Sequence, residues 1–456
     1  MRSILAVAKN TVAQALRMKV ALLVIVLLVI LLPMLWGITE GDGTLKGKLQ
    51  TFVSYGLSLT SLLLCCLTIA MSIYCVSDDI KRRHIYLVAT KPIRRSQILL
   101  GKFIGIVLLD ILLLAIFACF IWGFTMELSV IDKSSDEEIA VADRQFFTAR
   151  KEVQPRVDND KLRELADQRY KQLETLNQLP ETMTEEKIRR ELLNQERLKD
   201  RSVEVGHVKS WVFNNVSPES PDDTLFIQFK YEVASSTPDN KVLGLWAVGD
   251  DRQIEQYGPG QWKTNIYSVP RKDATRTQYE FEVPADCVAE DGYVSVIYKN
   301  PYENATTVIP MDIKLLYKAG SFNANYIRAV LVILSRLICI AAIGIFLSTW
   351  LSFPIAVLVL VVIFCMAVVN SFFVDSVDSL AQSAKLVYNF TLLPLVWMLP
   401  KFDGNYDPTP YIVSSKLLSN SLLGEIYLNT VLIKSSILML LGMLIFRARE
   451  LAKITV

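Results

Sequence analysis

The chain has 456 residues, of which 52% are hydrophobic and 21% are charged, and its formal net charge is +2. Basic and acidic residues are sorted by region instead of forming one basic face, so no nucleic-acid partner is expected. The two His and seven Cys residues show no zinc spacing, and only Cys287 lies in the polar part of the chain, which excludes a disulfide there. The composition predicts a membrane protein without a resident metal or cofactor.

Residues 1–19 predict an interfacial helix on the cytoplasmic leaflet, because Ile4, Ala8 and Val12 share one face of a helix. The apolar run from Val20 to Ile38 follows directly. At about 19 residues it is long enough to cross about 30 Å of hydrocarbon and too long for the core of a typical signal peptide. It is therefore expected to be an uncleaved first span.

Five further apolar runs meet the same length criterion. They are Phe52–Val76, Gly101–Phe124, Tyr326–Thr349, Pro354–Val374 and Ile426–Phe446. Lys and Arg gather in the amino end, in the 78–102 loop and in the tail, and short segments rich in these residues stay in the cytoplasm. We predict a polytopic α-helical protein of the inner (plasma) membrane, with six transmembrane helices in regions 20–124 and 326–456 and both termini in the cytoplasm.

The segment Leu386–Leu399 tests that count of spans. It is apolar over only about 14 residues, with Pro394 inside it and Pro400 at its end. A stretch of this length favours a re-entrant or interfacial element within an external region, 376–425.

The long insert between the third and fourth spans divides by composition, and both parts are expected to be extracytoplasmic. Region 125–202 is charged and predicts a helical hairpin or stalk, or ordinary solvated helix. In region 203–318 the hydrophobic period changes to two, which predicts an antiparallel β-sandwich. The expected strands are Val208–Phe213, Thr224–Val233, Val242–Val248, Trp262–Val269, Gln278–Val283, Tyr293–Tyr298 and Asp312–Leu316.

Aromatic residues recur along these strands, and Trp211, Trp246 and Trp262 are the largest. Such side chains form either a face that binds sugar or peptide or simply the core of the domain. Both interpretations stay open from the sequence.

The stretch from Asp78 to Lys102 is a polar island between two long apolar runs, and it is rich in Lys and Arg. Pro92 disfavours helix at Lys91, so the loop is expected to bend between two short helices. This pattern suits either a docking surface for a soluble partner or a topology signal with no partner.

The same stretch resembles a known family. An acid after a span, then Ala89-Thr90-Lys91-Pro92-Ile93-Arg94-Arg95 and Gln97 to Lys102, is similar to the loop between the second and third spans of ABC-2 type transporter permeases. The resemblance implies a coupling helix that sits on a separate ATPase subunit, with ATP and Mg bound there. It also implies a second permease subunit and a pair of short external helices between the fifth and sixth spans. The implied docking residues are Asp79, Arg82, Arg83, Thr90, Lys91, Pro92, Arg94, Arg95, Gly101 and Lys102.

Ionisable residues also lie within the expected spans, at Asp110, Arg336 and Lys434. A lone charge at mid-membrane costs roughly 2.5–3.5 kcal/mol on insertion scales, so these groups should face protein or water. We expect Arg336 to reach towards Asp110, either as a structural ion pair or as part of a substrate contact.

The sequence shows no catalytic constellation. Gly41 to Leu49 has the wrong spacing for a phosphate-binding loop, so another chain must bind the nucleotide if this protein uses ATP energy. We expect the permease subunit of an ABC transporter that exports or handles a lipid, glycan or protein of the envelope. The alternative is a membrane-anchored binding or scaffold protein, whose β-domain recognises a glycan or a protein without transport.

Overall fold

The computed structural model describes residues 2–39, 41, 43–81, 94–131, 136–179, 183–237, 239–256, 262–372 and 396–448. The chain forms two compact units. The helical unit comprises residues 1–149 and 320–456, and the β-unit comprises residues 150–319.

The described helices of the helical unit are α1 (Arg2–Leu16), α2 (Lys19–Ile38), α3 (Leu45–Lys81), α5 (Arg95–Ile131), α6 (Asp136–Gln145), α10 (Phe322–Ser348), α11 (Phe353–Val368), α14 (Thr409–Val413), α15 (Asn420–Ile426) and α16 (Ser436–Ala448). A π-helical segment, η4 (Tyr427–Ser435), joins α15 to α16, and a 3₁₀ turn covers Gly404–Tyr406.

Five of the described helices are long and apolar enough to cross a membrane, counting the run from α15 to α16 as one. The predicted fifth span contains α11, which has only 16 residues and falls below the usual length of about 20 for a span. The structure therefore confirms a membrane-type helical protein, whereas six crossings stay a prediction.

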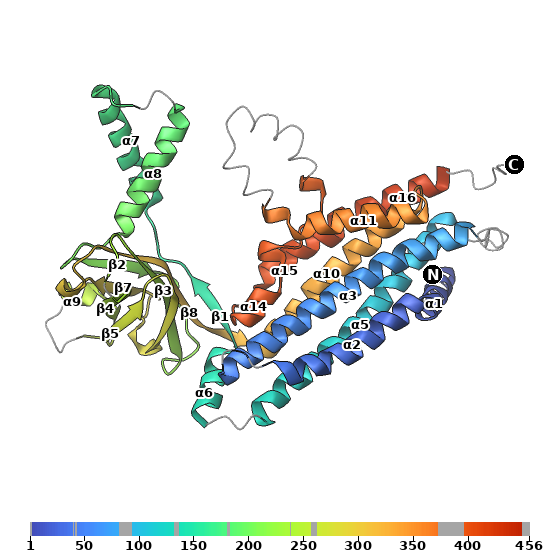
Figure 1. Cartoon of the computed structure of the whole chain (residues 1–456), viewed down its shortest axis with the longest axis horizontal. Coiled ribbons are helices and arrows are strands. Elements are labelled where there is room, and N and C mark those ends of the chain that lie inside the picture. The colour runs from blue at the N-terminus through green and yellow to red at the C-terminus, as the bar shows by residue number, and fades with distance from the viewer. Residues whose placement is uncertain are drawn as a thin grey trace. The chain divides into compact units, whose positions relative to one another are not determined.

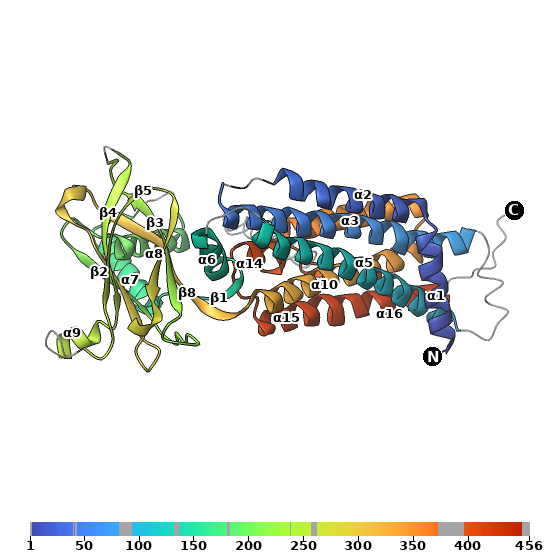
Figure 2. The same ribbon diagram turned by 90° about the horizontal axis from the view of Figure 1, so that it is seen from below.

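The helices α2, α3, α5, α10 and α16 run side by side in both views (Figures 1 and 2). Small residues set the spacing between them. Gly344 of α10 faces Ser72 of α3, where an added Cβ would lie 1.9 Å from the Ser72 hydroxyl oxygen. Gly56 of α3 likewise meets Ile121 of α5. Close backbone approach through small residues is how membrane helices gain packing energy without a hydrophobic driving force.

The predicted interfacial helix forms as α1 and lies against α5, not free of the bundle. Its buried residues Ala8, Thr11 and Ala15 form the contact face. On α5, a Cβ at Gly101 would lie 2.7 Å from the Val7 Cβ, and one at Gly105 would lie 2.8 Å from the Ala8 carbonyl oxygen. The two glycines therefore allow the backbones to cross in contact.

The amino end of the chain, the start of α5 and the end of α16 gather at one end of the helical unit (Figure 2). Arg95 donates to the carbonyl oxygen of Arg447 at 3.3 Å. At the other end Lys46 donates to Gln145 at 2.6 Å, and Gln50 donates to the carbonyl oxygen of Val413 at 2.6 Å. The start of α5 and the end of α16, which border two of the basic segments, therefore lie together at one end.

The β-unit carries a helical hairpin made of α7 (Asn159–Thr175) and α8 (Glu185–Arg201). The two helices share a small apolar contact of Ala166, Tyr170, Ile188 and Leu192. Ion pairs link their polar faces, with Arg169 at 2.8 Å from Glu196. These apolar residues therefore pair the two helices into a hairpin, one of the two arrangements expected from the sequence.

The rest of the β-unit is an antiparallel β-sandwich, as predicted (Figure 1). Its strands are β1 (Thr148–Val153), β2 (Val208–Phe213), β3 (Thr224–Val233), β4 (Lys241–Gly249), β5 (Tyr267–Ala274), β6 (Gln278–Pro284), β7 (Val294–Lys299) and β8 (Val308–Ser321), with the short helix α9 (Arg252–Gln256) after β4. The strand orders in the two sheets are β1-β8-β3-β6 and β2-β7-β4-β5. The buried residues of both sheets form one shared core.

Three details of the strands differ from the sequence prediction. β8 runs from Val308 to Ser321, well beyond the expected Asp312–Leu316. β1 lies at a sheet edge, where it pairs with β8, within a stretch that was expected to be helical. The sequence did not indicate this strand, because its residues are mostly polar and show little hydrophobic alternation. β5 begins at Tyr267, so Trp262 lies before the strand and not inside it.

The crossing of α1 over α5 predicts that substitutions of two glycines in α5 change the stability of the protein differently. Gly105→Ala places a Cβ 2.8 Å from the Ala8 carbonyl oxygen, and we expect it to destabilise the protein by about 1–3 kcal/mol. Gly123→Ala meets nothing within 4 Å and should be neutral or stabilising through its higher helix propensity. SDS-induced unfolding in mixed micelles measures both, and equal effects would contradict the close crossing.

Candidate functional site

Lys102 is buried at the end of the helical unit where α3 ends and α5 begins. Its side chain is 5% exposed, and its ammonium group lies 2.5 Å from the Asp79 carboxylate and donates to the carbonyl oxygen of Cys75. Gly101, the residue before it, lies against α1. The resemblance implied both residues as docking residues, but their burial assigns them to the packing of three helices.

Arg94 and Arg95 are the exposed members of the implied docking set among the described residues. The Arg94 backbone N–H donates to the Gln97 side chain at 3.2 Å, which supports the start of α5. The other implied residues, Arg82, Arg83, Thr90, Lys91 and Pro92, lie outside the described residues. The predicted bend at Lys91 and Pro92 stays a prediction.

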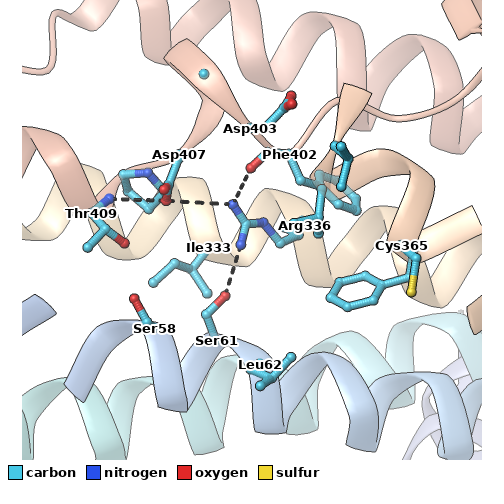
Figure 3. Close-up of a pocket in the computed structure, with 15 residues that line it drawn as sticks. Ser58, Ser61, Leu62, Ile333, Arg336, Cys365, Phe402, Asp403, Asp407 and Thr409 are labelled. Carbon is cyan, nitrogen blue, oxygen red and sulfur yellow. Dashed lines mark hydrogen bonds and ion pairs between the residues drawn. The ribbon is translucent and has the colours of Figure 1, made fainter. Parts of the chain in front are cut away.

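Arg336 lies about half-way along α10, and the partners of its guanidinium come from α3 and from the segment 396–408 (Figure 3). One nitrogen donates to the Ser61 hydroxyl of α3 at 3.2 Å, and another donates to the backbone carbonyl oxygen of Phe402 at 2.8 Å. The Asp407 carboxylate lies 4.0 Å away. With 12% of its side chain exposed, Arg336 is a buried cation held mainly by neutral acceptors.

The expected contact between Arg336 and Asp110 is wrong. The Asp110 side chain is fully buried and accepts a hydrogen bond from Thr68 of α3 at 2.9 Å. Thr68 lies seven residues beyond Ser61 on α3, or about 10 Å of helix, so the two ionisable groups sit at different depths. The second carboxylate oxygen of Asp110 has no hydrogen-bond partner among the described residues.

Lys434 also donates to a backbone carbonyl, that of Leu399, at 2.7 Å. Its ammonium group lies 6.0 Å from the ring centroid of Trp397, which supports the cation. Lys434 belongs to the π-helical segment η4, and the Asn429 side chain of the same segment donates to the Tyr406 hydroxyl at 3.3 Å. The segment 396–408 is therefore attached to η4 at two points.

The segment 396–408 is further fixed at the end of α11. The backbone N–H of Phe402 donates to the Ala367 carbonyl at 2.9 Å, and the backbone N–H of Ser371 donates to the Asp403 carboxylate at 2.5 Å. The Phe402 ring lies under the Arg336 guanidinium at 5.3 Å. The residues Asp403 and Asp407 were not predicted, although the short apolar run before Pro400 had indicated a segment that turns back.

The tryptophans of the β-unit do not form a common binding face. Trp246 is fully buried, and its indole N–H donates to the Tyr231 hydroxyl at 2.7 Å; burial raises the pKa of that hydroxyl. Trp211 is 8% exposed and packs on Trp246 at 6.3 Å. Trp262, at 42% exposed, is the one of the three that reaches the surface. Trp211 and Trp246 are core residues.

Known proteins add no constraint on these assignments: no family model, curated protein or solved structure matches the chain. Within the described part of the chain, no group of three His, Cys, Asp or Glu side chains is placed to hold a metal ion. The assignments above therefore rest on contacts within this chain.

The partners of Arg336 predict which double substitutions interact. Arg336→Gln combined with Ser61→Ala should be non-additive, with a coupling of about 0.5–3 kcal/mol in the free energy of unfolding, because the two side chains are bonded. Arg336→Gln combined with Asp110→Asn should be additive to within about 0.5 kcal/mol, because the groups lie apart. SDS-induced unfolding in mixed micelles measures the free energies of the single and double variants. Coupling between Arg336 and Asp110, with none between Arg336 and Ser61, would contradict the contacts described above.

Proposed function

We propose that this chain is the membrane subunit of an ATP-driven transporter of the ABC-2 type. The helical unit crosses the inner (plasma) membrane six times, with both termini in the cytoplasm and the β-unit on the extracytoplasmic side. A separate ATPase subunit binds Mg and ATP. A second permease subunit, identical or related, completes the pathway for a lipid, glycan or protein of the envelope.

The proposal rests on the contacts between the helix ends that flank residues 82–93. The Lys102–Asp79 ion pair joins the end of α3 to the start of α5, and Gly101 joins α5 to α1. A partner that pushes on the basic loop between these helix ends therefore moves a stiff set of helices, not a single flexible one. An ATPase can transmit movement to the membrane helices only if the helix ends that it pushes on are firmly packed together.

Two further features support this assignment over a passive anchor. The exposed side chains of Arg94 and Arg95 offer charge to a soluble partner at the start of α5. The alternative of a membrane-anchored binding or scaffold protein is weakened, because two of the three tryptophans considered for ligand binding, Trp211 and Trp246, are buried. A transporter subunit is therefore the function that the geometry supports best.

The proposed orientation is tested with two exposed serines, Ser96 at the start of α5 and Ser217 in the β-unit. Each is replaced by Cys in a background without other cysteines. A membrane-impermeant maleimide should label Ser217→Cys from the envelope side and Ser96→Cys only in inverted vesicles, because basic segments stay inside. Labelling of Ser96→Cys from the envelope side would overturn the whole scheme.

The proposed partner is tested by purification from native membranes. An ATPase should copurify with the wild-type chain. The double variant Arg94→Glu, Arg95→Glu should lower its recovery about tenfold or more, since tenfold needs only about 1.4 kcal/mol and two attractions become repulsions. The matched control is Arg163→Glu, Lys171→Glu on the exposed face of α7, which should keep the ATPase.

Mass spectrometry and ATP hydrolysis by the eluate report the outcome. Equal recovery of the ATPase with both double variants would contradict docking at Arg94 and Arg95. Absence of any ATPase from the wild-type preparation would contradict the proposed function itself.

A further inference from the structure

A cavity of about 420 Å³ lies within the helical unit (Figure 3). Its walls come from α3, α10, α11 and the segment 402–409. Cavities of about 300–1,000 Å³ that combine apolar walls with a few polar groups are the usual size of small-molecule sites. The proposed transporter function assigns no role to this one.

The polar side of the cavity contains groups that are buried and incompletely bonded. Arg336 Nε and Asp403 Oδ1 both lack a hydrogen-bond partner within the described part of the chain. The Asp407 carboxylate, 39% exposed, lies 4.0 Å from Arg336, which is long for an ion pair. Buried polar atoms without partners require an explanation, such as a bound molecule that the protein itself does not supply. An occupant with both an acceptor and a donor is complementary to the charged side chains that line the cavity, Arg336, Asp403 and Asp407.

The wall also has an apolar part, which is exposed on α3 and at the end of α11. Leu62, Val368 and Val369 line the cavity and are 49%, 42% and 45% exposed. A sugar or a peptide would lose water against this wall without gaining hydrogen bonds, and a pure hydrocarbon would offer no polar group to the charges of Arg336, Asp403 and Asp407 that line the cavity. The occupant must therefore be amphipathic.

The charges on the cavity wall select the head group. Arg336 is formally positive, whereas Asp403 and Asp407 are formally negative. An anionic head would meet two carboxylates, and a purely cationic head would meet the guanidinium. A head with a phosphate for Arg336 and an ammonium N–H for the carboxylates is complementary to all three.

We propose that this cavity binds a zwitterionic phospholipid whose head carries a primary ammonium group, as in phosphatidylethanolamine. The phosphate accepts from Arg336, the ammonium group donates to Asp403 and Asp407, and an acyl chain lies along Leu62, Val368 and Val369. Occupancy of the cavity does not depend on transport, so the proposal goes beyond the proposed function and stands or fails separately.

The test is lipid binding to the purified full chain, measured by native mass spectrometry. Phosphatidylethanolamine, phosphatidylcholine and phosphatidylglycerol with the same acyl chains are titrated in turn. Phosphatidylethanolamine should bind about tenfold more tightly than the other two, which corresponds to one charge-assisted hydrogen bond. Phosphatidylcholine or phosphatidylglycerol binding equally well would overturn the proposed head group.

Two variants on α11 separate the cavity from general lipid contact. Cys365 lines the cavity, so Cys365→Trp fills it without removing a polar partner, and selective binding should fall about tenfold. Val361→Trp, at a position 41% exposed and outside the lining, should bind as the wild type does. Wild-type selectivity in Cys365→Trp, with the fold verified by circular dichroism, would place the lipid elsewhere and overturn the proposal.

A third variant tests the carboxylate. Asp407→Asn keeps the shape of the wall and removes one negative charge, so the preference for phosphatidylethanolamine over phosphatidylcholine should shrink severalfold. An unchanged preference would contradict the assigned role of the ammonium group. None of these measurements involves an ATPase, so their failure leaves the proposed function untouched.

Discussion

Backbone carbonyls that lie among membrane helices without helical partners need donors, and this constraint shapes the centre of the helical unit. Residues 399–403 are irregular backbone, yet Phe402 contacts Arg336 half-way along α10. In hydrocarbon each unbonded backbone group costs several kcal/mol, so irregular backbone is tolerated only where protein or a cavity satisfies it. Arg336 donates to the carbonyl of Phe402 and Lys434 to that of Leu399. Each cation gains an acceptor, and each carbonyl gains a donor.

The same exchange recurs at the end of α3, where buried Lys102 donates to the Cys75 carbonyl while pairing with Asp79. A carbonyl dipole gives a cation an acceptor without adding a second charge that must also be desolvated, and Lys102 has the Asp79 carboxylate as a charged partner as well. Arg336, Lys434 and Lys102 therefore each hold two segments of the helical unit together. The functional roles proposed for this chain fall on the exposed charges of Arg94 and Arg95 at the start of α5, and on the atoms of Arg336 and Asp403 that have no hydrogen-bond partner among the described residues.

The sequence predicts those features of the fold that depend on the pattern of hydrophobic residues. Apolar run lengths gave the long helices, and the period of two gave the sandwich, with β2 and β3 at the predicted bounds. The partners of Arg336 could not be predicted, because a carbonyl acceptor such as that of Phe402 leaves no mark on residue type. The role of Gly101 could not be decided from the sequence either, because a glycine is equally suited to a docking loop and to a close crossing of two helices. Trp246 was ambiguous because strand alternation does not say which face is the core.

The π-helical segment η4 explains how one helix can fix the segment 396–408 at two points. Asn429 bonds the Tyr406 hydroxyl and Lys434 bonds the Leu399 carbonyl, so residues five apart serve the same neighbour. In an α-helix of 3.6 residues per turn, side chains five apart point about 140° from each other, and one of the two would face away. A π-helix bonds residue i to residue i+5 and brings such positions onto one side. The Ser435 hydroxyl, which donates to the Thr430 carbonyl at 2.7 Å, follows the same spacing. Conversion of η4 to α-helix would therefore release one of the two attachments, which couples the geometry of the last helix to the position of Phe402 and Asp403 at the cavity wall.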